Sequence, residues 1–171
     1  LQLLTAKPVL YVCNVDEENA ASGNAYSEEV EAMASAHGAA CVVISAAIEE
    51  EISQLDSEEA KLFLDEMGLN QPGLSRLIEA GYNLLDLQTY FTCGPKETRA
   101  WTVQKGVSAP QAAGVIHGDF EKGFIRAETI AFEDYIALGG ESAARDAGKL
   151  RAEGKSYIVQ DGDVMHFLHS N

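Results

Sequence analysis

Two short runs of apolar residues, rich in β-branched side chains, constrain the fold of this chain more than any other feature. Residues 8–13 are PVLYVC, and residues 40–44 are ACVVI. Runs that are apolar at nearly every position suit strands buried on both faces, as in parallel sheets. Residues 26–38 between them have helical spacing, with Ser27 as the expected N-cap and Gly38 at the end. We therefore expect a strand–helix–strand unit with a right-handed crossover.

Two further helical segments follow the second run. Residues 56–68 begin with Asp56 and Glu59 in a capping-box pattern and end at a glycine. Residues 71–85 carry Pro72 near their start, where proline is compatible with a helix. An apolar stripe runs along this last segment, formed by Leu74, Leu77, Ile78, Tyr82 and Leu85. We interpret both segments as helices that pack through their apolar faces and carry no chemistry of their own.

The sequence pattern changes after residue 87, so we divide the chain into a first module, residues 1–87, and a second, residues 88–171. The second module has a strand-like pair of segments, then a helix-like segment, then further strand-like segments. Residues 160–163, QDGD, indicate a turn between two short strands. This order predicts a small α+β sheet with a helix on one face.

The net charge of −15 is distributed unevenly between the two modules. The first has three basic and 16 acidic residues, a net charge of −13, whereas the second has nine basic and 11 acidic residues, a net charge of −2. A difference this large also argues for two modules. Nucleic acid should be repelled by the first module, and the charge of the second gives no support for strong nonspecific binding.

Nothing in the sequence indicates a membrane or an oxidising compartment. The chain has no apolar run of about 18 residues, which a membrane span would need, and no signal-peptide pattern. Its three cysteines, Cys13, Cys41 and Cys93, are far apart in the sequence and show no C-x-x-C spacing. We expect buried or idle thiols in a cytoplasmic protein, with neither disulfides nor zinc.

A polar loop follows each of the two apolar runs. Residues 14–17, NVDE, come directly after the first run, and residues 45–47, SAA, come after the second. In open parallel sheets, ligands bind beyond the carboxyl ends of the strands. Two neighbouring strand ends could therefore converge on one ligand. The alternative is that NVDE is a solvated loop and SAA a tight strand end.

These loops resemble the base-recognition loops of P-loop GTPases, which carry N-K-x-D after one strand and S-A-x after the next. Val15 replaces the lysine here, and Glu17 replaces the final aspartate. The resulting N-x-x-E order resembles the YchF/Obg-like ATPase family, which prefers ATP to GTP. Adenine has a ring-nitrogen acceptor where guanine has a donor, so a carboxylate at the guanine-reading position would be unfavourable.

The resemblance also implies roles for individual residues. Asn14 would bond to the imidazole edge of the purine, and the Val15 carbonyl would accept from the exocyclic amine. In the related GTPases, a backbone N–H of the S-A-x loop donates to the base. The implied cofactor is ATP, and the implied cofactor-binding residues are Asn14, Val15, Glu17, Ser45, Ala46 and Ala47.

Several segments of the second module are similar to the TGS domain that closes proteins of this family. They are residues 85–92, 94–103, 109–128 and 155–167. The resemblance implies a ubiquitin-like β-grasp fold and association with the ribosome or the translation machinery. The expected fold class is therefore an α/β partial P-loop-type nucleotide domain, a βαβ unit plus helices, followed by an α+β TGS domain.

Lys96, Arg99, Trp101 and Lys105 form a second candidate group in the TGS-like module. In an extended strand, Arg99, Trp101, Val103 and Lys105 would share one face. A basic and aromatic face could stack on RNA bases or clamp phosphates. The alternative is a half-buried tryptophan flanked by solubilising charges.

Two other features have a functional and a structural interpretation. His117 could act as a general base, but we expect a helix-end residue paired with the backbone or a nearby acid. Four acids, Asp119, Glu121, Asp161 and Asp163, could suggest a cation site. Because they lack EF-hand spacing, we expect turn-forming and surface roles and no metal.

The sequence lacks the motifs that hold the phosphates of a nucleotide. It contains no G-x-x-x-x-G-K-S/T loop and no D-x-x-G switch that could hold magnesium or orient water, since its one D-x-x-G match, residues 65–68, ends a predicted helix. Phosphoryl transfer depends on positioning and charge neutralisation around those phosphates and a magnesium ion. We therefore expect the C-terminal portion of a longer protein, which does not hydrolyse ATP alone and relies on residues outside this sequence for Mg²⁺. A rival hypothesis is a β-grasp adaptor with no role in nucleotide binding.

Overall fold

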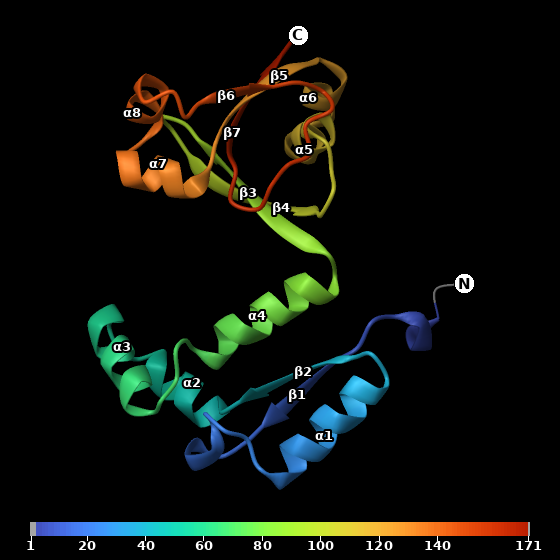
Figure 1. Ribbon diagram of the computed structural model, residues 1–171, viewed down its shortest axis with the longest axis vertical. Coiled ribbons are helices and arrows are strands. Elements are labelled where there is room, and N and C mark those ends of the chain that lie inside the picture. The colour runs from blue at the N-terminus through green and yellow to red at the C-terminus, as the bar shows by residue number, and fades with distance from the viewer. Residues whose placement is uncertain (1–2, 171) are drawn as a thin grey trace. The chain divides into compact units, whose positions relative to one another are not determined.

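A computed structural model describes residues 3–170 of the chain (Figure 1). The chain divides into two compact units, Leu1–Leu85 and Asp86–Asn171. The division thus lies between residues 85 and 86, whereas the sequence analysis places it after residue 87. Each unit is described separately below.

The first unit is built on a strand–helix–strand motif, as expected. Strand β1, Leu10–Asn14, pairs in parallel with β2, Ala40–Ile44, and the register runs from Leu10 opposite Ala40 to Asn14 opposite Ile44. Helix α1, Ala25–Ala36, connects the two strands and contacts both. The N-cap of α1 is Asn24, whereas the sequence pattern predicts Ser27.

Ser27 still takes part in capping, three residues further along the helix. Its backbone N–H donates to Asn24 Oδ1 at 3.0 Å, and the Asn24 N–H donates to Ser27 Oγ at 2.8 Å. Both groups of this reciprocal box belong to the start of α1, where backbone donors have no helical partner. The helix therefore begins two residues before the expected cap.

The remaining segments of the first unit are helical. Their bounds are η1 Leu4–Ala6, η2 Glu17–Asn19, α2 Ala46–Ile52, α3 Ser57–Glu66 and α4 Gly73–Leu84. The capping box predicted for Asp56 and Glu59 is present at the start of α3. A small core forms around Ala20, Ile48, Leu64 and Leu69.

The apolar surfaces of this unit are less buried than the sequence predicts. Every residue of β2 is half-buried, and Val12 of β1 is 44% exposed. On α4, Leu74 and Ile78 are exposed, as is Leu85 at its C-cap, although α4 contacts both strands. The two strands make a two-stranded sheet, so burial on both faces needs more chain than residues 3–85 provide.

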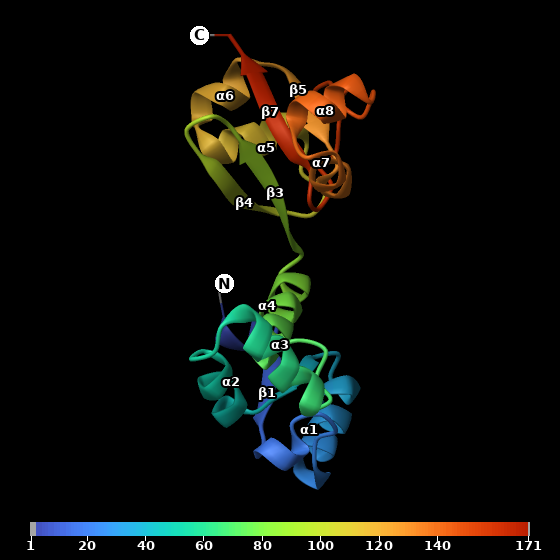
Figure 2. The same ribbon diagram turned by 90° about the vertical axis from the view of Figure 1, so that its left-hand side faces the viewer.

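The second unit is a five-stranded mixed sheet in the order β4-β3-β7-β5-β6 (Figure 2). Its strands are β3 Leu87–Cys93, β4 Thr98–Gln104, β5 Phe124–Ile130, β6 Arg151–Glu153 and β7 Val164–His169. Its helices are α5 Ala109–Ile116, α6 Gly118–Lys122, α7 Phe132–Leu138 and α8 Glu141–Asp146. The predicted order of hairpin, helix and further strands is therefore correct. The pair β3–β7 is parallel, and the other strand pairs are antiparallel.

The core of the second unit lies between the sheet and α5. Tyr90 of β3 is fully buried there, and its hydroxyl donates to the Ala112 carbonyl of α5 at 2.9 Å. The ring of Phe167 from β7 meets Tyr90 edge-on, at 5.8 Å between centroids. Because burial disfavours the phenolate, the pKa of Tyr90 is raised above its usual range.

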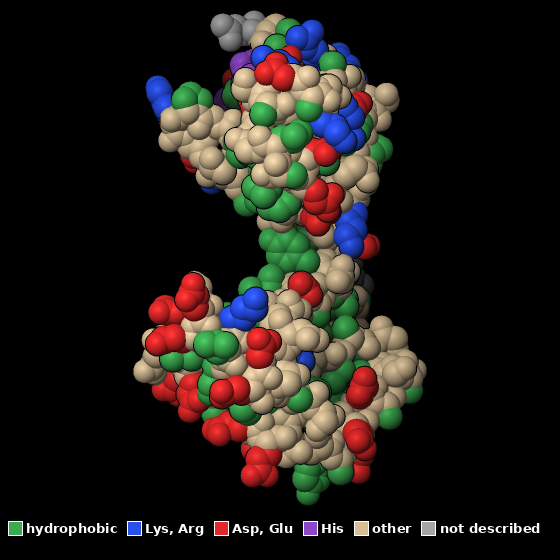
Figure 3. Space-filling view, turned by 60° about the vertical axis from the view of Figure 1, so that its left-hand side comes forward, with side chains coloured by type: hydrophobic (Ala, Val, Ile, Leu, Met, Phe, Trp, Pro, Cys, Tyr) green, Lys and Arg blue, Asp and Glu red, His purple; other side chains and the backbone are tan. Residues whose placement is uncertain are grey.

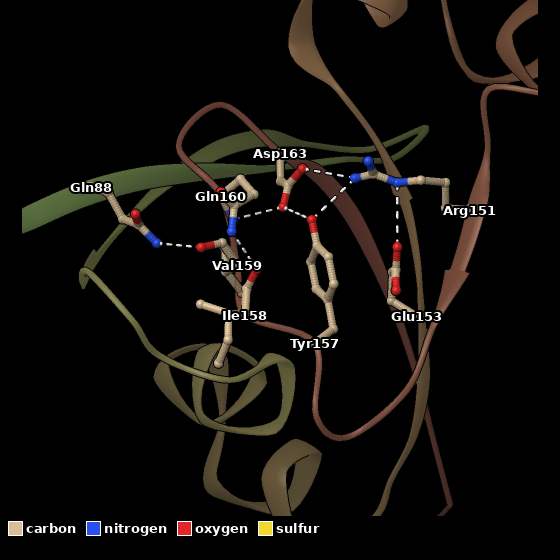
Figure 4. A network of polar contacts seen from close by, with 8 residues as sticks. All are labelled: Gln88, Arg151, Glu153, Tyr157, Ile158, Val159, Gln160 and Asp163. Carbon is tan, nitrogen blue, oxygen red and sulfur yellow. Dashed lines mark hydrogen bonds and ion pairs between the residues drawn. The ribbon is translucent and has the colours of Figure 1, made fainter.

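A polar network fixes the segment that leads into β7 (Figure 4). The buried carboxylate of Asp163 accepts from the Tyr157 hydroxyl at 2.7 Å and from the Gln160 N–H at 2.9 Å, and Arg151 lies 3.3 Å away. Gln88 of β3 donates to the Val159 carbonyl at 2.8 Å. The predicted turn at residues 160–163 is present, but the residues before it form only an isolated bridge, between Ile158 and Ser108.

Candidate functional site

The parallel register of β1 and β2 brings the two polar loops together at one edge of the first unit. Asn14 ends β1 directly opposite Ile44, the last residue of β2. The Val15 N–H donates to the Ile44 carbonyl at 2.9 Å. The Ala46 N–H donates to Asn14 Oδ1, also at 2.9 Å. One side chain of the first loop is therefore bonded to the backbone of the second.

The first loop exposes two of its predicted site residues. Asn14 and Glu17 are exposed, and Val15 is half-buried between them. Asp16, which the sequence analysis did not select, caps η2, because its Oδ1 accepts from the Asn19 N–H at 3.1 Å. Aspartate is a favoured N-cap residue, and this preference could have revealed the role.

The second loop combines a buried hydroxyl with exposed backbone. Ser45 is only 2% exposed, and within residues 3–170 its Oγ has no hydrogen-bond partner. It occupies the N-cap position of α2 without making a side-chain cap. Ala46 and Ala47 follow and are exposed. A buried hydroxyl without a partner is costly, so this loop retains unused hydrogen-bonding capacity.

Glu49 of α2 joins the helix that follows the second loop to the start of α4, and no sequence pattern indicated this role. Its carboxylate accepts from the Gly73 N–H at 2.6 Å and from the Leu74 N–H at 3.1 Å, at the start of α4. Gly73 is buried, and a Cβ on it would lie 2.9 Å from Ile44 Cγ2. The end of β2, α2 and the start of α4 are thus held in contact.

The structure corrects the basic and aromatic face expected on β4. Arg99 and Trp101 lie on that strand, but Val103 on the same face is only 5% exposed and belongs to the core. Lys105 lies beyond the end of β4, and Lys96 lies in the turn before it. Alternate residues of a strand share a face, and because Val103 packs in the core with α5, only part of this face is open to solvent.

Two of these residues do form a local pair. The Arg99 guanidinium lies 4.2 Å from the centroid of the Trp101 ring. The indole N–H of Trp101 donates to Thr92 Oγ1 at 2.9 Å. The tryptophan is half-buried against the core, which agrees with the alternative interpretation of this segment.

His117 and the four acids have structural contacts. His117 is the N-cap of α6, where its Nδ1 accepts from the Asp119 N–H at 3.2 Å, so the helix-end interpretation is correct. Asp161 accepts from the Thr89 N–H at 2.8 Å. Within residues 3–170, no group of three or more His, Cys, Asp or Glu side chains is arranged to hold a metal ion.

Two of the cysteines that are distant in the sequence are neighbours in space. Cys13 of β1 and Cys41 of β2 are free thiols whose sulfurs lie 3.7 Å apart. Burial, followed by the contact with Cys13, raises the pKa of Cys41 to about 11. The Cys41 thiol is therefore not expected to be reactive near neutral pH.

None of the helices within residues 3–170 is both long enough and apolar enough to cross a bilayer.

Comparison with known proteins identifies the family. The family described as YchF-GTPase_C, a protein of unknown function, matches residues 87–170. The "Ribosome-binding ATPase YchF" of Escherichia coli O157:H7 is 56% identical over 168 residues, which are 98% of this chain and 46% of that protein. This chain belongs to the YchF/Obg-like family.

Two further relatives of this YchF/Obg-like chain agree in sequence and in fold. The "Obg-like ATPase 1" of Gallus gallus is 42% identical over 95% of this chain and 42% of its own length. The structure of the Schizosaccharomyces pombe YchF GTPase superposes with a TM-score of 0.81 at 39% identity, covering 97% of this chain and 44% of that one. The chain thus spans less than half the length of these relatives.

Proposed function

We propose that this chain is the C-terminal portion of an ATP-binding YchF/Obg-like protein and that its two polar loops bind the adenine base. The loops are residues 14–17 and residues 45–47, called the base-site loops below. The observation that carries the proposal is the hydrogen bond from the Ala46 N–H to Asn14 Oδ1, at 2.9 Å. It joins two segments, 32 positions apart, that resemble the two base-recognition elements of P-loop GTPases.

The bonding of Asn14 leaves one of its side-chain groups for a ligand. Its oxygen already accepts from Ala46, and the residue is exposed, so its Nδ2 amide is the group that can donate to a purine ring nitrogen. In Val15 the N–H is engaged with Ile44, which leaves the carbonyl to accept from the exocyclic amine of adenine. The residues therefore fit a base that offers an acceptor and an amine.

Glu17 would contribute selectivity between purines. It is exposed, and its side chain is one methylene longer than the aspartate of the guanine-reading motif. Acidic side chains gather over the visible face of the first unit (Figure 3). Such surroundings suit a neutral base better than phosphates, which is consistent with reading only the base here.

The phosphates and Mg²⁺ would be held by residues outside this sequence. The sequence lacks the G-x-x-x-x-G-K-S/T loop that holds the phosphates, and it spans 46% of its E. coli relative. When bound, Mg²⁺ would neutralise charge on the phosphates during transfer. We expect ATP hydrolysis in the full-length protein and none from this chain alone.

The second unit would be the TGS domain. Its strand order, β4-β3-β7-β5-β6, becomes 2-1-5-3-4 when the strands are renumbered within the unit, which supports the ubiquitin-like β-grasp assignment. The E. coli relative is named a ribosome-binding ATPase, so we propose the ribosome as the partner and the cytoplasm as the location.

The alternative function is a β-grasp interaction module without a nucleotide role. RNA contact through Lys96, Arg99 and Trp101 is a variant of this alternative, and the exposed Arg99 above Trp101 is the observation in its favour. Such binding would weaken steeply with salt, because it releases counterions from the phosphates.

Nucleotide titration of the full-length protein separates these functions. We expect Asn14→Ala to weaken ATP binding about tenfold, the effect of losing roughly 1.4 kcal/mol from one hydrogen bond. Glu17→Asp should improve GTP binding relative to ATP. Glu18→Asp makes the same change one residue away and should alter neither. No binding of nucleotide by the full-length protein would favour the interaction module, and unchanged affinities in all three variants would contradict base recognition by these loops.

A further inference from the structure

The two central strands of the second unit are paired over an unusually short stretch. Strand β7 lies between β5 and β3 (Figure 2). With β5 its register extends from Val164 to His169, but with β3 it has the single pair Phe91 and Val164. Within residues 3–170, the β3-facing edge of β7 after that pair therefore has no strand partner. Such an edge offers backbone N–H and C=O groups to another strand.

A hollow of about 450 Å³ opens along this edge. Its apolar lining comes from β4, α5, α6 and β7, through Trp101, Ile116, Phe120 and Phe167. The turn at residues 94–97 forms part of its rim. A second hollow, of about 540 Å³, adjoins the first, because Phe120 and His169 line both of them. The rings of these two residues are stacked, with their centroids 4.0 Å apart.

One lysine and one glutamate, Lys96 and Glu97, line the first hollow. Lys96 is exposed and forms no ion pair with any residue in the described part of the chain. Arg99 stacks on Trp101, and its ion pair with Glu97, at 3.8 Å, is solvent-exposed and therefore weak. His166 and His169 also line the hollow. This arrangement favours a ligand that carries a negative charge near Lys96.

We propose that this hollow binds an extended peptide, which adds to the free edge of β7 as a further strand. The peptide would place apolar side chains at alternate positions on the aromatic lining and an acidic residue near Lys96. The edge from Met165 to His169 extends for about 16 Å, enough for about five peptide residues.

A peptide fits these features better than RNA does. An added strand pairs with the alternating N–H and C=O groups of the edge, whereas a nucleic acid would leave most of them without partners. Residues 88–171 carry a net charge of −2, which does not favour a polyanion. This inference does not depend on nucleotide binding by the first unit.

Selection from a random octapeptide library displayed on phage, with the full-length protein as target, tests the proposal. The recovered peptides should alternate apolar residues and carry an acid at one end. Their affinity, measured by fluorescence anisotropy, should fall about tenfold in Lys96→Glu. Lys155→Glu is the control, since Lys155 is exposed in the same unit but does not line the hollow.

Amide hydrogen exchange then decides where the peptide binds. At saturating peptide, the amides of residues 165–169 that face β3 should exchange at least tenfold more slowly. Protection of β4 instead, recovery of no peptide, or equal binding by both lysine variants would overturn the proposal. Displacement of the peptide by a uridine 12-mer, with loss of that effect at high salt, would assign the hollow to RNA instead.

Discussion

Single polar side chains join segments of this protein that are far apart in the sequence. Asn14 accepts from the backbone of Ala46, and Glu49 accepts from the backbone at the start of α4. Asp163 makes shorter connections, because it accepts from Tyr157 and Gln160, six and three residues before it. In each case one side chain satisfies backbone or hydroxyl groups that would otherwise lack partners, so losing it should cost more than the bond itself.

The hydroxyl of Tyr157 provides the clearest test of such a contact. Removing it in Tyr157→Phe leaves the buried Asp163 carboxylate short of one donor, and we expect a loss of about 1–3 kcal/mol in stability. Urea unfolding followed by tryptophan fluorescence reports on the second unit alone, because Trp101 is the only tryptophan. Tyr26→Phe, at a side chain that is 80% exposed, should leave this transition unchanged. An equal effect of both changes would contradict the role of Tyr157.

The Cys41 thiol should titrate well above an ordinary cysteine. Its pKa is raised from 9.0 to about 11, first by burial and then by the contact with Cys13. The pKa of Cys41 is higher in the folded protein than in the unfolded chain. Its contribution to the free energy of unfolding is fully present below pH 9.0, the unfolded pKa, and is lost as the pH rises to about 11, the folded pKa.

Alkylation with iodoacetamide, followed by mass spectrometry, measures this titration. The reaction at Cys41 should reach half its maximal rate near pH 11, and Cys13→Ala should lower that midpoint, because one cause of the shift is removed. A midpoint at or below pH 9 in the parent protein would show that the thiol is not held in this environment.

At the scale of helices and strands, contacts between elements determine which substitutions are tolerated. Gly73 and Gly81 both lie in α4. A Cβ at Gly73 would approach Ile44 and Glu49 to 2.9 Å, whereas a Cβ at Gly81 would meet nothing within 4 Å. The same substitution at the two positions therefore separates close packing from helix propensity.

We expect Gly73→Ala to destabilise the first unit by about 1–3 kcal/mol, because the neighbours must move. Gly81→Ala should stabilise it by about 0.5–1 kcal/mol through helix propensity. Thermal unfolding followed by circular dichroism at 222 nm measures both changes. Stabilisation by both substitutions would mean that α4 does not lie close to the end of β2.

Local patterns in the sequence predicted most elements but not their burial. The runs at residues 8–13 and 40–44 and the box at Asp56 identified strands and a helix start, because these signals act within a few residues. Val103 was placed on an open face and lies in the core, since only the packing of α5 determines which face of β4 is covered.

The candidate site was predictable in position but not in its contacts. The sequence placed Asn14 and Ser45 after neighbouring strands, and the structure brings their loops together. The hydrogen bond from Ala46 to Asn14 and the role of Glu49 depend on three-dimensional packing, whereas the cap made by Asp16 is local. No local pattern could have revealed the first two of them.

At the scale of the whole molecule, this chain spans 46% of its E. coli relative, and the proposed activity requires the rest. The base-site loops would supply recognition of the base, whereas the phosphate and metal chemistry would come from residues outside this sequence. Recognition by the base-site loops therefore concerns only the adenine end of the nucleotide. It can be tested in the full-length protein without measuring hydrolysis.

The most direct measurement is a double-mutant cycle between Asn14 and the N7 atom of adenine. Calorimetric titration would compare ATP with 7-deaza-ATP, which lacks that acceptor, in the parent protein and in Asn14→Ala. Loss of N7 should weaken binding about tenfold in the parent and hardly at all in the variant, a coupling of roughly 1.4 kcal/mol. Equal affinities for the two nucleotides in the parent, or the same loss in both proteins, would contradict recognition of the base by Asn14.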